Sequence, residues 1–351
     1  MDPLKRLAQS KARETSYNLE RFGYREVEAS RGESAYVWEE PDKFGALVVE
    51  GLGTKNLVAE AMRPITGKTY HDQLSQDDIA MIVNDCLTVG ALPMVVNAYF
   101  AAGSSGWFAD EQRKEDLTSG FRDACNKAGA VYGGGESPVL KGIILDGTAD
   151  LAGACVGEIK PKSRLILGDK LKAGDRIILI ESSGIHANGL TLAREIEARL
   201  PNGYKTLLPS GRMYGEALLT PTHIYVKLIR DLFEAGVDIH YLVNVTGHGW
   251  RKLMRANRDF TYVIHALPQV PEELSLIQKV SGNDDREMYG NLNMGAGFAI
   301  YIPEADVDKV QQIGLENGLF TYDSGHIEEG SKQVVIESKN LIFKETDLQV
   351  R

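Results

Sequence analysis

An apolar segment at residues 44–50, FGALVVE, continues without a break into the glycine turn GLGTK at residues 51–55. Its apolar and β-branched composition predicts a buried strand. The glycines of the turn let the backbone approach an anion closely. Thr54 adds a hydroxyl donor, and Lys55 adds a point charge that suits a phosphate. Read locally, the turn is either a phosphate-binding loop or a strand end that carries a surface lysine.

Strands and helices alternate along the rest of the chain. Apolar residues recur at i, i+3, i+4 and i+7 in residues 76–90 and at intervals of four in residues 111–128, which predicts two helices. Strands are expected at 94–100, 130–137, 148–159, 171–182, 260–267 and 296–302, and further helices at 189–199, 222–235 and 304–314. This alternation favours an α/β or α+β fold over a helix bundle.

The length of 351 residues suits two domains at roughly 100–200 residues each. The composition restarts where the strand at 171–182 is entered. We therefore expect a polar N-terminal segment over residues 1–43, an N-terminal domain over 44–168 and a C-terminal domain over 169–345. The 36 glycines make up about a tenth of the chain, above the usual share of ~7%. They indicate tight turns rather than disorder, because 43% of the residues are hydrophobic.

Charge and composition exclude several classes of function. A net charge of −10 disfavours non-specific binding to nucleic acid. No segment approaches the ~18 consecutive apolar residues of a membrane span, and the first residues lack the apolar centre of a signal peptide. We expect a cytoplasmic protein without nucleic-acid or membrane partners. The three cysteines lie far apart among apolar neighbours, which predicts buried free thiols.

Several catalytic motifs are missing from the sequence. It contains no GxSxG, no HExxH and no zinc-ligand spacing, and no GxGxxG follows the first strand. The segment ITGKT at residues 65–69 imitates the end of a P-loop. Position 62 is methionine where that motif requires glycine, so a loop without phosphate-binding function is expected there.

Acidic and amide side chains gather on one side of the helix expected at 76–90, namely Asp77, Asp78, Asn84 and Asp85. One interpretation is a solvated helix face. The other is a magnesium site, because Mg²⁺ takes carboxylates together with substrate phosphates. Glu50 and Glu136 both end expected strands beside glycines, so these two residues and Asp85 would converge if the two strands lie close together.

Two polar glycine turns in the second half also follow apolar segments. SSGIHANG at 182–189 contains His186 and Asn188, and NVTGHGW at 244–250 begins with Asn244. A histidine in such a loop is either a proton shuttle or phosphate contact, or a bystander. The two turns indicate that both halves of the chain face one ligand.

Taken together, these segments resemble the aminoimidazole ribonucleotide synthetase family, also called phosphoribosylformylglycinamidine cyclo-ligases. The matching stretches run in the family's order over residues 44–300: EGLGTK, HDQLSQDDIAMIVND, GALP, GGES, DLAGACVGEI, SSGIHANG, LLTPTHIYVK, VTGHG and EMYGNLNMGAGF. The first, second and fourth are shared with a wider superfamily that includes thiamine-monophosphate kinase, so they imply ATP use. The SSG-x-H-x-NG, PT-x-IYVK and EMY stretches are more particular to the cyclo-ligases.

The resemblance implies an ATP-dependent reaction of de novo purine biosynthesis. Formylglycinamidine ribonucleotide would be closed to aminoimidazole ribonucleotide, with release of ADP and phosphate. ATP would activate the formyl oxygen, and the neighbouring nitrogen would then attack. The resemblance also implies a magnesium ion, two α/β domains and a homodimer formed through the N-terminal sheets.

The same resemblance assigns residues to the site. The nucleotide would contact Gly51, Gly53, Thr54, Lys55, Asp77, Asn84, Gly134 and Gly135. The catalytic set would be Lys55, His186, Asn188 and Asn244. The metal ligands would be Glu50, Asp85 and Glu136.

The chain departs from the family pattern at several of these places. Glu50 stands where aspartate is usual, Ala98 replaces an aspartate, Asn244 replaces a histidine, and His248 occupies the third position of the following turn. Two alternatives therefore stay open. One is another ATP-dependent enzyme of the superfamily that activates a different amide or small acceptor, and the other is a nucleotide-binding paralogue without catalysis.

Overall fold

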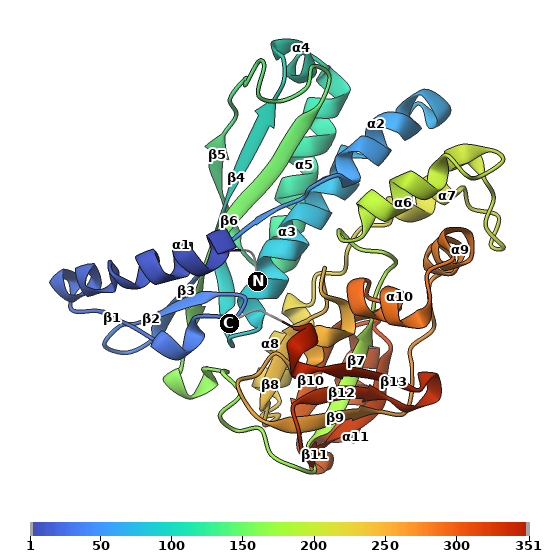
Figure 1. The fold of residues 1–351 in the computed structure, drawn as a ribbon. Helices are drawn as coiled ribbons and strands as arrows, with labels where there is room; N and C mark the ends of the chain where they lie inside the picture. Colours follow the sequence, from blue (N-terminus) through green and yellow to red (C-terminus); the bar gives the residue numbers. More distant parts are fainter. Residues whose placement is uncertain (1–2, 349–351) are drawn as a thin grey trace.

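A computed structural model describes residues 3–348, and it contains two β-sheets with helices packed against them (Figure 1). The first sheet has six strands in the order β1-β2-β3-β6-β4-β5, and the second has seven in the order β13-β12-β9-β11-β7-β10-β8. The first sheet uses only strands from the first half of the chain, and the second uses only strands from the other half. The expected two-domain α/β architecture is confirmed.

The N-terminal domain places its longer helices on one face of its sheet. Its strands are β1 (Arg25–Glu26), β2 (Tyr36–Glu39), β3 (Phe44–Gly51), β4 (Leu92–Ala102), β5 (Val131–Glu136) and β6 (Ala149–Ile159). Its helices are α1 (Pro3–Arg13), α2 (Lys55–Thr66), α3 (His71–Leu87), α4 (Ser105–Phe108) and α5 (Glu111–Ala128). α3 packs against β3 and β6, and α5 packs against α3. The core side chains of β3, Ala46 and Val48, face these helices.

Burial extends nearly all the way around α3. Its polar residues Asp77, Asp78, Asn84 and Asp85 are all buried, as are its apolar ones. The helix lies between the first sheet, α5 and two elements of the C-terminal domain, α8 and β8. The interpretation of these polar residues as a solvated face is therefore wrong, because the side of α3 that bears them is covered by the other domain.

The C-terminal domain is built on strands that are largely apolar. They are β7 (Arg176–Glu181), β8 (Tyr241–Asn244), β9 (Phe260–Ile264), β10 (Ala296–Ile302), β11 (Thr321–Glu329), β12 (Gln333–Ile336) and β13 (Leu341–Lys344). The helices are α6 (Leu190–Glu197), α7 (Tyr214–Leu218), α8 (Val226–Glu234), α9 (Glu272–Ser281), α10 (Asp285–Asn291) and α11 (Val307–Glu316). β7 and β8 flank β10, in which every residue is buried. The loops that follow β7 and β8 therefore leave the sheet near one another.

Most expected elements are present. The helix expected at 111–128 has those bounds, and the strand expected at 44–50 extends by one residue. The helix α2 was not expected, and the ITGKT segment at its end was predicted to be a loop because it lacks the first glycine of a P-loop. Pro64 lies inside the helix, and Gly67 ends it with a φ of 77°, so residues 65 and 66 are helical. The prediction of a loop over 65–69 is wrong for those two residues.

Part of the polar segment 1–43 joins the first sheet, since β2 pairs with β3 in antiparallel register. The last strand of the first sheet ends at Ile159 and the first strand of the second begins at Arg176, and a division at residue 168 stays a prediction. All three cysteines are buried and free, as expected. Within residues 3–348, no helix is both long enough and apolar enough to span a membrane.

Candidate active site between the two domains

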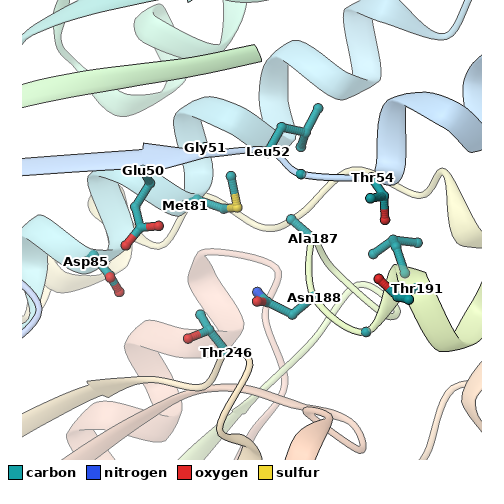
Figure 2. Close-up of a pocket in the computed structure, with 13 residues that line it drawn as sticks. Glu50, Gly51, Leu52, Thr54, Met81, Asp85, Ala187, Asn188, Thr191 and Thr246 are labelled. Atoms are coloured by element: carbon teal, nitrogen blue, oxygen red, sulfur yellow. The ribbon is translucent and has the colours of Figure 1, made fainter. Parts of the chain in front are cut away.

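A pocket of about 280 Å³ opens between the end of β3 and the loops that follow β7 and β8 (Figure 2). The N-terminal domain lines it with Glu50, Gly51, Leu52, Gly53, Thr54, Met81 and Asp85. The C-terminal domain lines it with Ala187, Asn188, Gly189, Leu190, Thr191 and Thr246. The two glycine turns expected to face one ligand thus both reach this pocket.

The turn after β3 forms one wall of the pocket. Gly53 has a φ of 69°, a left-handed conformation that glycine adopts without strain. Thr54 precedes the first residue of α2, so the N-terminal end of a twelve-residue helix faces the pocket. Unpaired backbone N–H groups and the helix dipole make such an end a site for phosphate oxygens. Gly51, Gly53 and Thr54, which were expected at the nucleotide, all line the pocket, and their contact with a nucleotide stays a prediction.

Two carboxylates lie at one end of the pocket. Glu50 is the penultimate residue of β3 and Asp85 lies on α3, and the oxygen-bearing ends of their side chains point toward one another (Figure 2). Burial and the neighbouring Asp85 carboxylate raise the pKa of Glu50 to about 7. Asp85 accepts a hydrogen bond of 2.8 Å from Nδ2 of Asn244, which is itself buried. Asn244 therefore holds a carboxylate in place and does not itself line the pocket.

A buried ammonium completes this end of the pocket. Lys252 lies on a short 3₁₀ helix, Gly249–Met254, and its Nζ donates to Oγ1 of Thr246 at 2.7 Å. Burial lowers the pKa of Lys252 to about 8, while the Asp85 and Glu50 carboxylates oppose that shift. We call the five residues Glu50, Asp85, Asn244, Thr246 and Lys252 the Glu50 cluster.

The Glu50 cluster fits a magnesium ion that arrives with a nucleotide. Mg²⁺ is commonly held by one or two carboxylates together with phosphate oxygens and waters. The side chains of Glu50 and Asp85 supply two carboxylates that face one another at the pocket wall. Within residues 3–348, no group of three or more histidine, cysteine, aspartate or glutamate side chains could hold a metal ion by itself.

Glu136 does not join the two carboxylates. It ends β5, the edge strand of the sheet, and β6 and β4 lie between β5 and β3. With about 4.8 Å between neighbouring strands, Glu136 is roughly 14 Å from the end of β3. Gly134 and Gly135 lie on the same strand and are absent from the pocket wall. The expected convergence of Glu50, Asp85 and Glu136 within one chain is wrong, because it assumed that β3 and β5 are close.

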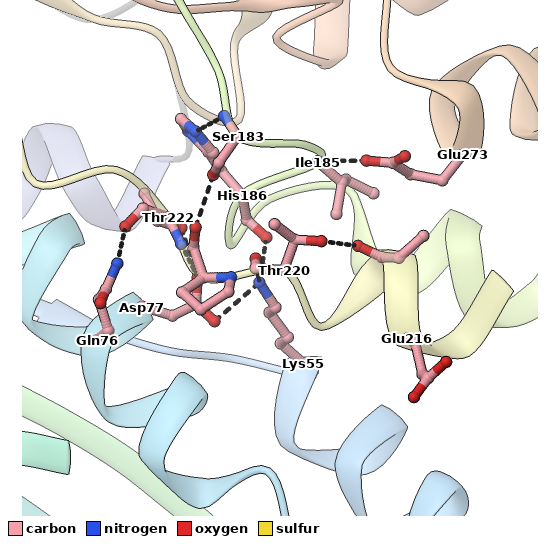
Figure 3. Close-up of polar contacts among 12 residues, drawn as sticks. Lys55, Gln76, Asp77, Ser183, Ile185, His186, Glu216, Thr220, Thr222 and Glu273 are labelled. Carbon is pink, nitrogen blue, oxygen red and sulfur yellow. Dashed lines mark hydrogen bonds and ion pairs between the residues drawn. The ribbon is translucent and has the colours of Figure 1, made fainter. Parts of the chain in front are cut away.

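Lys55 also lies elsewhere than expected. Its side chain is fully buried, and it pairs with the Asp77 carboxylate at 2.8 Å (Figure 3). Its Nζ also donates to the backbone oxygens of His186 at 3.0 Å and Thr220 at 2.9 Å. These three contacts occupy all three donors of the ammonium group. In this conformation Lys55 ties the two domains together and presents no donor to a phosphate.

The neighbouring polar residues of α3 make the same kind of contact. Asp77 accepts hydrogen bonds from the backbone N–H and the hydroxyl of Thr222. The Asn84 amide donates to the backbone oxygen of His223 at 2.8 Å and accepts from the N–H of Tyr225 at 3.0 Å. We call Lys55, Asp77 and Asn84, with residues 220–225, the Lys55 cluster. Asp77 and Asn84, expected at the nucleotide, therefore lie in a contact between domains.

The loop after β7 carries two residues that were expected to be catalytic, and only one of them lines the pocket. His186 is buried, its Nε2 accepts the N–H of Ser183 at 3.1 Å, and burial lowers its pKa well below the usual range. Its ring is absent from the pocket wall, so the expected proton-shuttle role has no support in this geometry. Asn188, two residues further on, projects into the pocket as expected (Figure 2).

Sequence reasoning did not assign Thr246, Thr191 or Lys252. Thr246 belongs to the turn at 244–250, so its motif was noticed but its hydroxyl was not. The residues around Lys252, GWRKLM, match no motif that is associated with a binding site. The position of the lysine directly after a polar glycine turn is the one feature that could have indicated it.

Two family comparisons cover most of the chain. The family described as AIR synthase related protein, N-terminal domain, matches residues 32–159, and AIR synthase related protein, C-terminal domain, matches residues 172–337. The phosphoribosylformylglycinamidine cyclo-ligase of Methanobrevibacter smithii is 35% identical over 298 residues, which is 82% of each chain. That of Carboxydothermus hydrogenoformans is 36% identical over 296 residues, 82% of this chain and 81% of the relative.

Solved structures share the fold at lower identity. AaThiL complexed with AMPPCP and TMP aligns with a TM-score of 0.60 and 16% identity, over 89% of this chain and 90% of that one. A HypE–HypF complex aligns with a TM-score of 0.61 and 15% identity, over 90% and 93%. HypE in complex with ATP aligns with a TM-score of 0.57 and 17% identity, over 77% and 78%.

Proposed function

The chain belongs to the AIR synthase related protein family, and from that premise we propose that it closes formylglycinamidine ribonucleotide to aminoimidazole ribonucleotide at the expense of ATP. In this reaction the formyl oxygen attacks the terminal phosphorus of ATP, and ADP leaves. The neighbouring nitrogen then attacks the activated carbon, the carbon–oxygen bond breaks, and phosphate departs with that oxygen. A proton is lost from the nitrogen as the ring closes. With this substrate and product, the reaction is a step of de novo purine biosynthesis.

The observation that carries this proposal is the composition of the pocket wall. The Gly51–Thr54 turn, the N-terminal end of α2 and two facing carboxylates lie around one space. Phosphoryl transfer depends on positioning and charge neutralisation more than on a covalent nucleophile. Glu50 and Asp85 would hold Mg²⁺, which would neutralise charge on the phosphates. The residues of this wall therefore match the chemistry that the first step needs.

The opposite wall suits the acceptor. Asn188 and Thr191 lie on the loop and first turn of α6, and both face the nucleotide wall across the pocket (Figure 2). An amide and a hydroxyl can each donate and accept hydrogen bonds, so together they can orient an amidine or a formamide group. On this proposal, the acceptor binds to the C-terminal domain and the nucleotide binds to the N-terminal domain.

The proposal includes a homodimer formed through the first sheet. Opposite α3 and α5, the sheet exposes an apolar row in which Leu47 pairs with Val156, Val156 with Val95, and Val95 with Val131. All four are exposed, and Val49 beside them is 73% exposed. A contiguous apolar face of this kind marks an interaction surface. Sedimentation of the wild type and of Val49→Lys tests the dimer, since a buried lysine would shift the mass toward the monomer.

The activity itself is tested with purified protein, ATP, Mg²⁺ and formylglycinamidine ribonucleotide. Aminoimidazole ribonucleotide and ADP formed in equal amounts support the proposal. ADP released without the imidazole product would indicate a different acceptor. ATP bound with neither product would indicate a nucleotide-binding paralogue without catalysis. Asp85→Asn serves as the matched control, because it keeps the side-chain shape and removes a carboxylate from the pocket wall.

A further inference from the structure

Lys252 carries a positive charge that the fold itself does not neutralise by direct contact. Its side chain is 4% exposed, and its Nζ has one hydrogen bond, the 2.7 Å contact with Thr246. Among the described residues 3–348, Lys252 forms no ion pair within 4.0 Å. An ammonium group has three donors, so two of them have no acceptor in this part of the chain. Burying a charge in this way costs stability, and Lys252 therefore calls for an explanation other than folding.

The neighbours of Lys252 are charged but lie at a distance. The carboxylates of Asp85, Glu50 and Glu33 all favour its protonated form, whereas the guanidinium of Arg255 disfavours it. Within residues 3–348, no ion pair of 4.0 Å or less joins Lys252 to Asp85 or Glu50, so these carboxylates act on the ammonium from a distance. Two carboxylates that face one another and a positive charge set back from them suit a phosphate with its Mg²⁺, because the carboxylates can bind the metal and the ammonium attracts the phosphate.

Thr246 carries the effect of Lys252 to the pocket. The hydroxyl oxygen of Thr246 accepts the Lys252 donor, so its own hydrogen is directed elsewhere. Thr246 lines the pocket, whereas Lys252 lies behind it. A hydroxyl donor supported by a positive charge prefers an anionic oxygen, because hydrogen bonds to charged groups are stronger than neutral ones.

We propose that Lys252 is a positioning residue for the terminal phosphoryl group of bound ATP, acting through the Thr246 hydroxyl and through its own charge. The proposal rests on the proposed function in taking ATP as the nucleotide. It assigns the γ-phosphate to the end of the pocket where the Glu50 cluster lies. The Gly51–Thr54 turn and the end of α2 are left for the phosphates nearer the nucleoside.

The test compares two nucleotides that differ in the terminal group. Titration calorimetry in the presence of Mg²⁺ gives the affinities for AMPPCP and for ADP. Lys252→Met and Thr246→Val should weaken AMPPCP binding roughly 10- to 100-fold, the size expected for a charged hydrogen bond, and should leave ADP binding within about twofold. Lys252→Arg and Thr246→Ser, which keep the charge and the hydroxyl, should restore most of the AMPPCP affinity. Lys172→Met, at an exposed lysine of the same domain, is the control.

Thermal unfolding of the same variants separates a structural role from this one. If AMPPCP and ADP affinities fall together, or if neither changes while the unfolding temperature moves, Lys252 is a structural residue and the proposal is overturned. If the variants lose affinity for AMPPCP alone, and the wild type forms no aminoimidazole ribonucleotide, the inference on Lys252 stands and the proposed acceptor is rejected. A wild type that binds neither nucleotide would overturn both.

Discussion

The Lys55 cluster and the Glu50 cluster both include residues of helix α3, but they differ in whether their buried ammonium group has an ion-pair partner. In the Lys55 cluster, the ammonium group has three acceptors, and the Asn84 amide bonds to the chain on both sides. In the Glu50 cluster, two carboxylates face one another, and the nearby Lys252 ammonium forms no ion pair with any residue between 3 and 348. Polar groups with every partner present hold a fold together, whereas charges left without direct partners at a pocket wall are available to a ligand.

The largest change in the free energy of unfolding is expected when the contacts of the Lys55 ammonium are removed. Lys55→Met leaves the Asp77 carboxylate buried without its cation, which should lower the free energy of unfolding by about 3–5 kcal/mol. Urea unfolding followed by fluorescence measures this. Lys68→Met, at an exposed lysine past the end of α2, should change stability by less than about 0.5 kcal/mol.

The double variant Lys55→Met with Asp77→Leu sharpens this result. Removing both charges avoids the unpaired carboxylate, so much of the lost stability should return. If Lys55→Met instead keeps wild-type stability and loses only nucleotide affinity, Lys55 is a phosphate contact in the working enzyme, and its buried position here belongs to another state.

Asp85→Asn should show the reverse pattern. The amide still accepts the Asn244 hydrogen bond but loses the negative charge that a metal ion needs, so turnover should fall by about 10²-fold or more. Its unfolding free energy should stay within about 1 kcal/mol of the wild type, since a buried like charge beside Glu50 is removed. Steady-state kinetics at saturating Mg²⁺ and chemical unfolding give both quantities. A large loss of stability with normal turnover would show that Asp85 stabilises the fold and does not serve the reaction.

The raised pKa of Glu50 predicts that the stability of the protein depends on pH. Its pKa is raised from 4.5 to about 7 in the folded protein, so between these values the folded state binds more protons than the unfolded state. Stability should therefore fall as pH rises from about 4.5 to 7, by an amount on the order of 2 kcal/mol. Urea unfolding in metal-free buffer measures the slope, and Glu50→Gln should flatten it. A slope that persists unchanged in Glu50→Gln would assign the titration to another group.

The smallest effects come from a matched pair of asparagines. Asn84→Ala removes two hydrogen bonds between the domains and should cost about 1–3 kcal/mol of stability. Asn188→Ala removes a pocket amide for which the structure gives no hydrogen bond among the described residues, so stability should hold while the KM for the acceptor rises roughly tenfold. Thermal unfolding and initial-rate kinetics on both variants check the contrast, which fails if the two behave alike.

The sequence predicted most of the secondary structure, because apolar periodicity records which face of each element is buried. It also indicated, from the turns at 182–189 and 244–250, that both halves of the chain would face one ligand, and residues of both turns line the pocket together with the turn at 51–55. It could not place Lys55, since a polar residue on a helix gives the same pattern whether its neighbour is water or another domain. Glu136 was misplaced for a different reason: strand order is a long-range property, and no local pattern indicates that β6 and β4 lie between β3 and β5.

The hydrogen bond between Lys55 and the backbone of His186 also bears on the width of the pocket. Thr54 and Ala187 form facing walls, and each is the immediate chain neighbour of one partner in that bond. The separation of the walls is therefore set by a contact between residues that do not line the pocket. A change of acceptor size would follow from an altered loop length on one side of that contact or from smaller side chains at the start of α6. Residues outside the pocket can thus determine which molecules enter it.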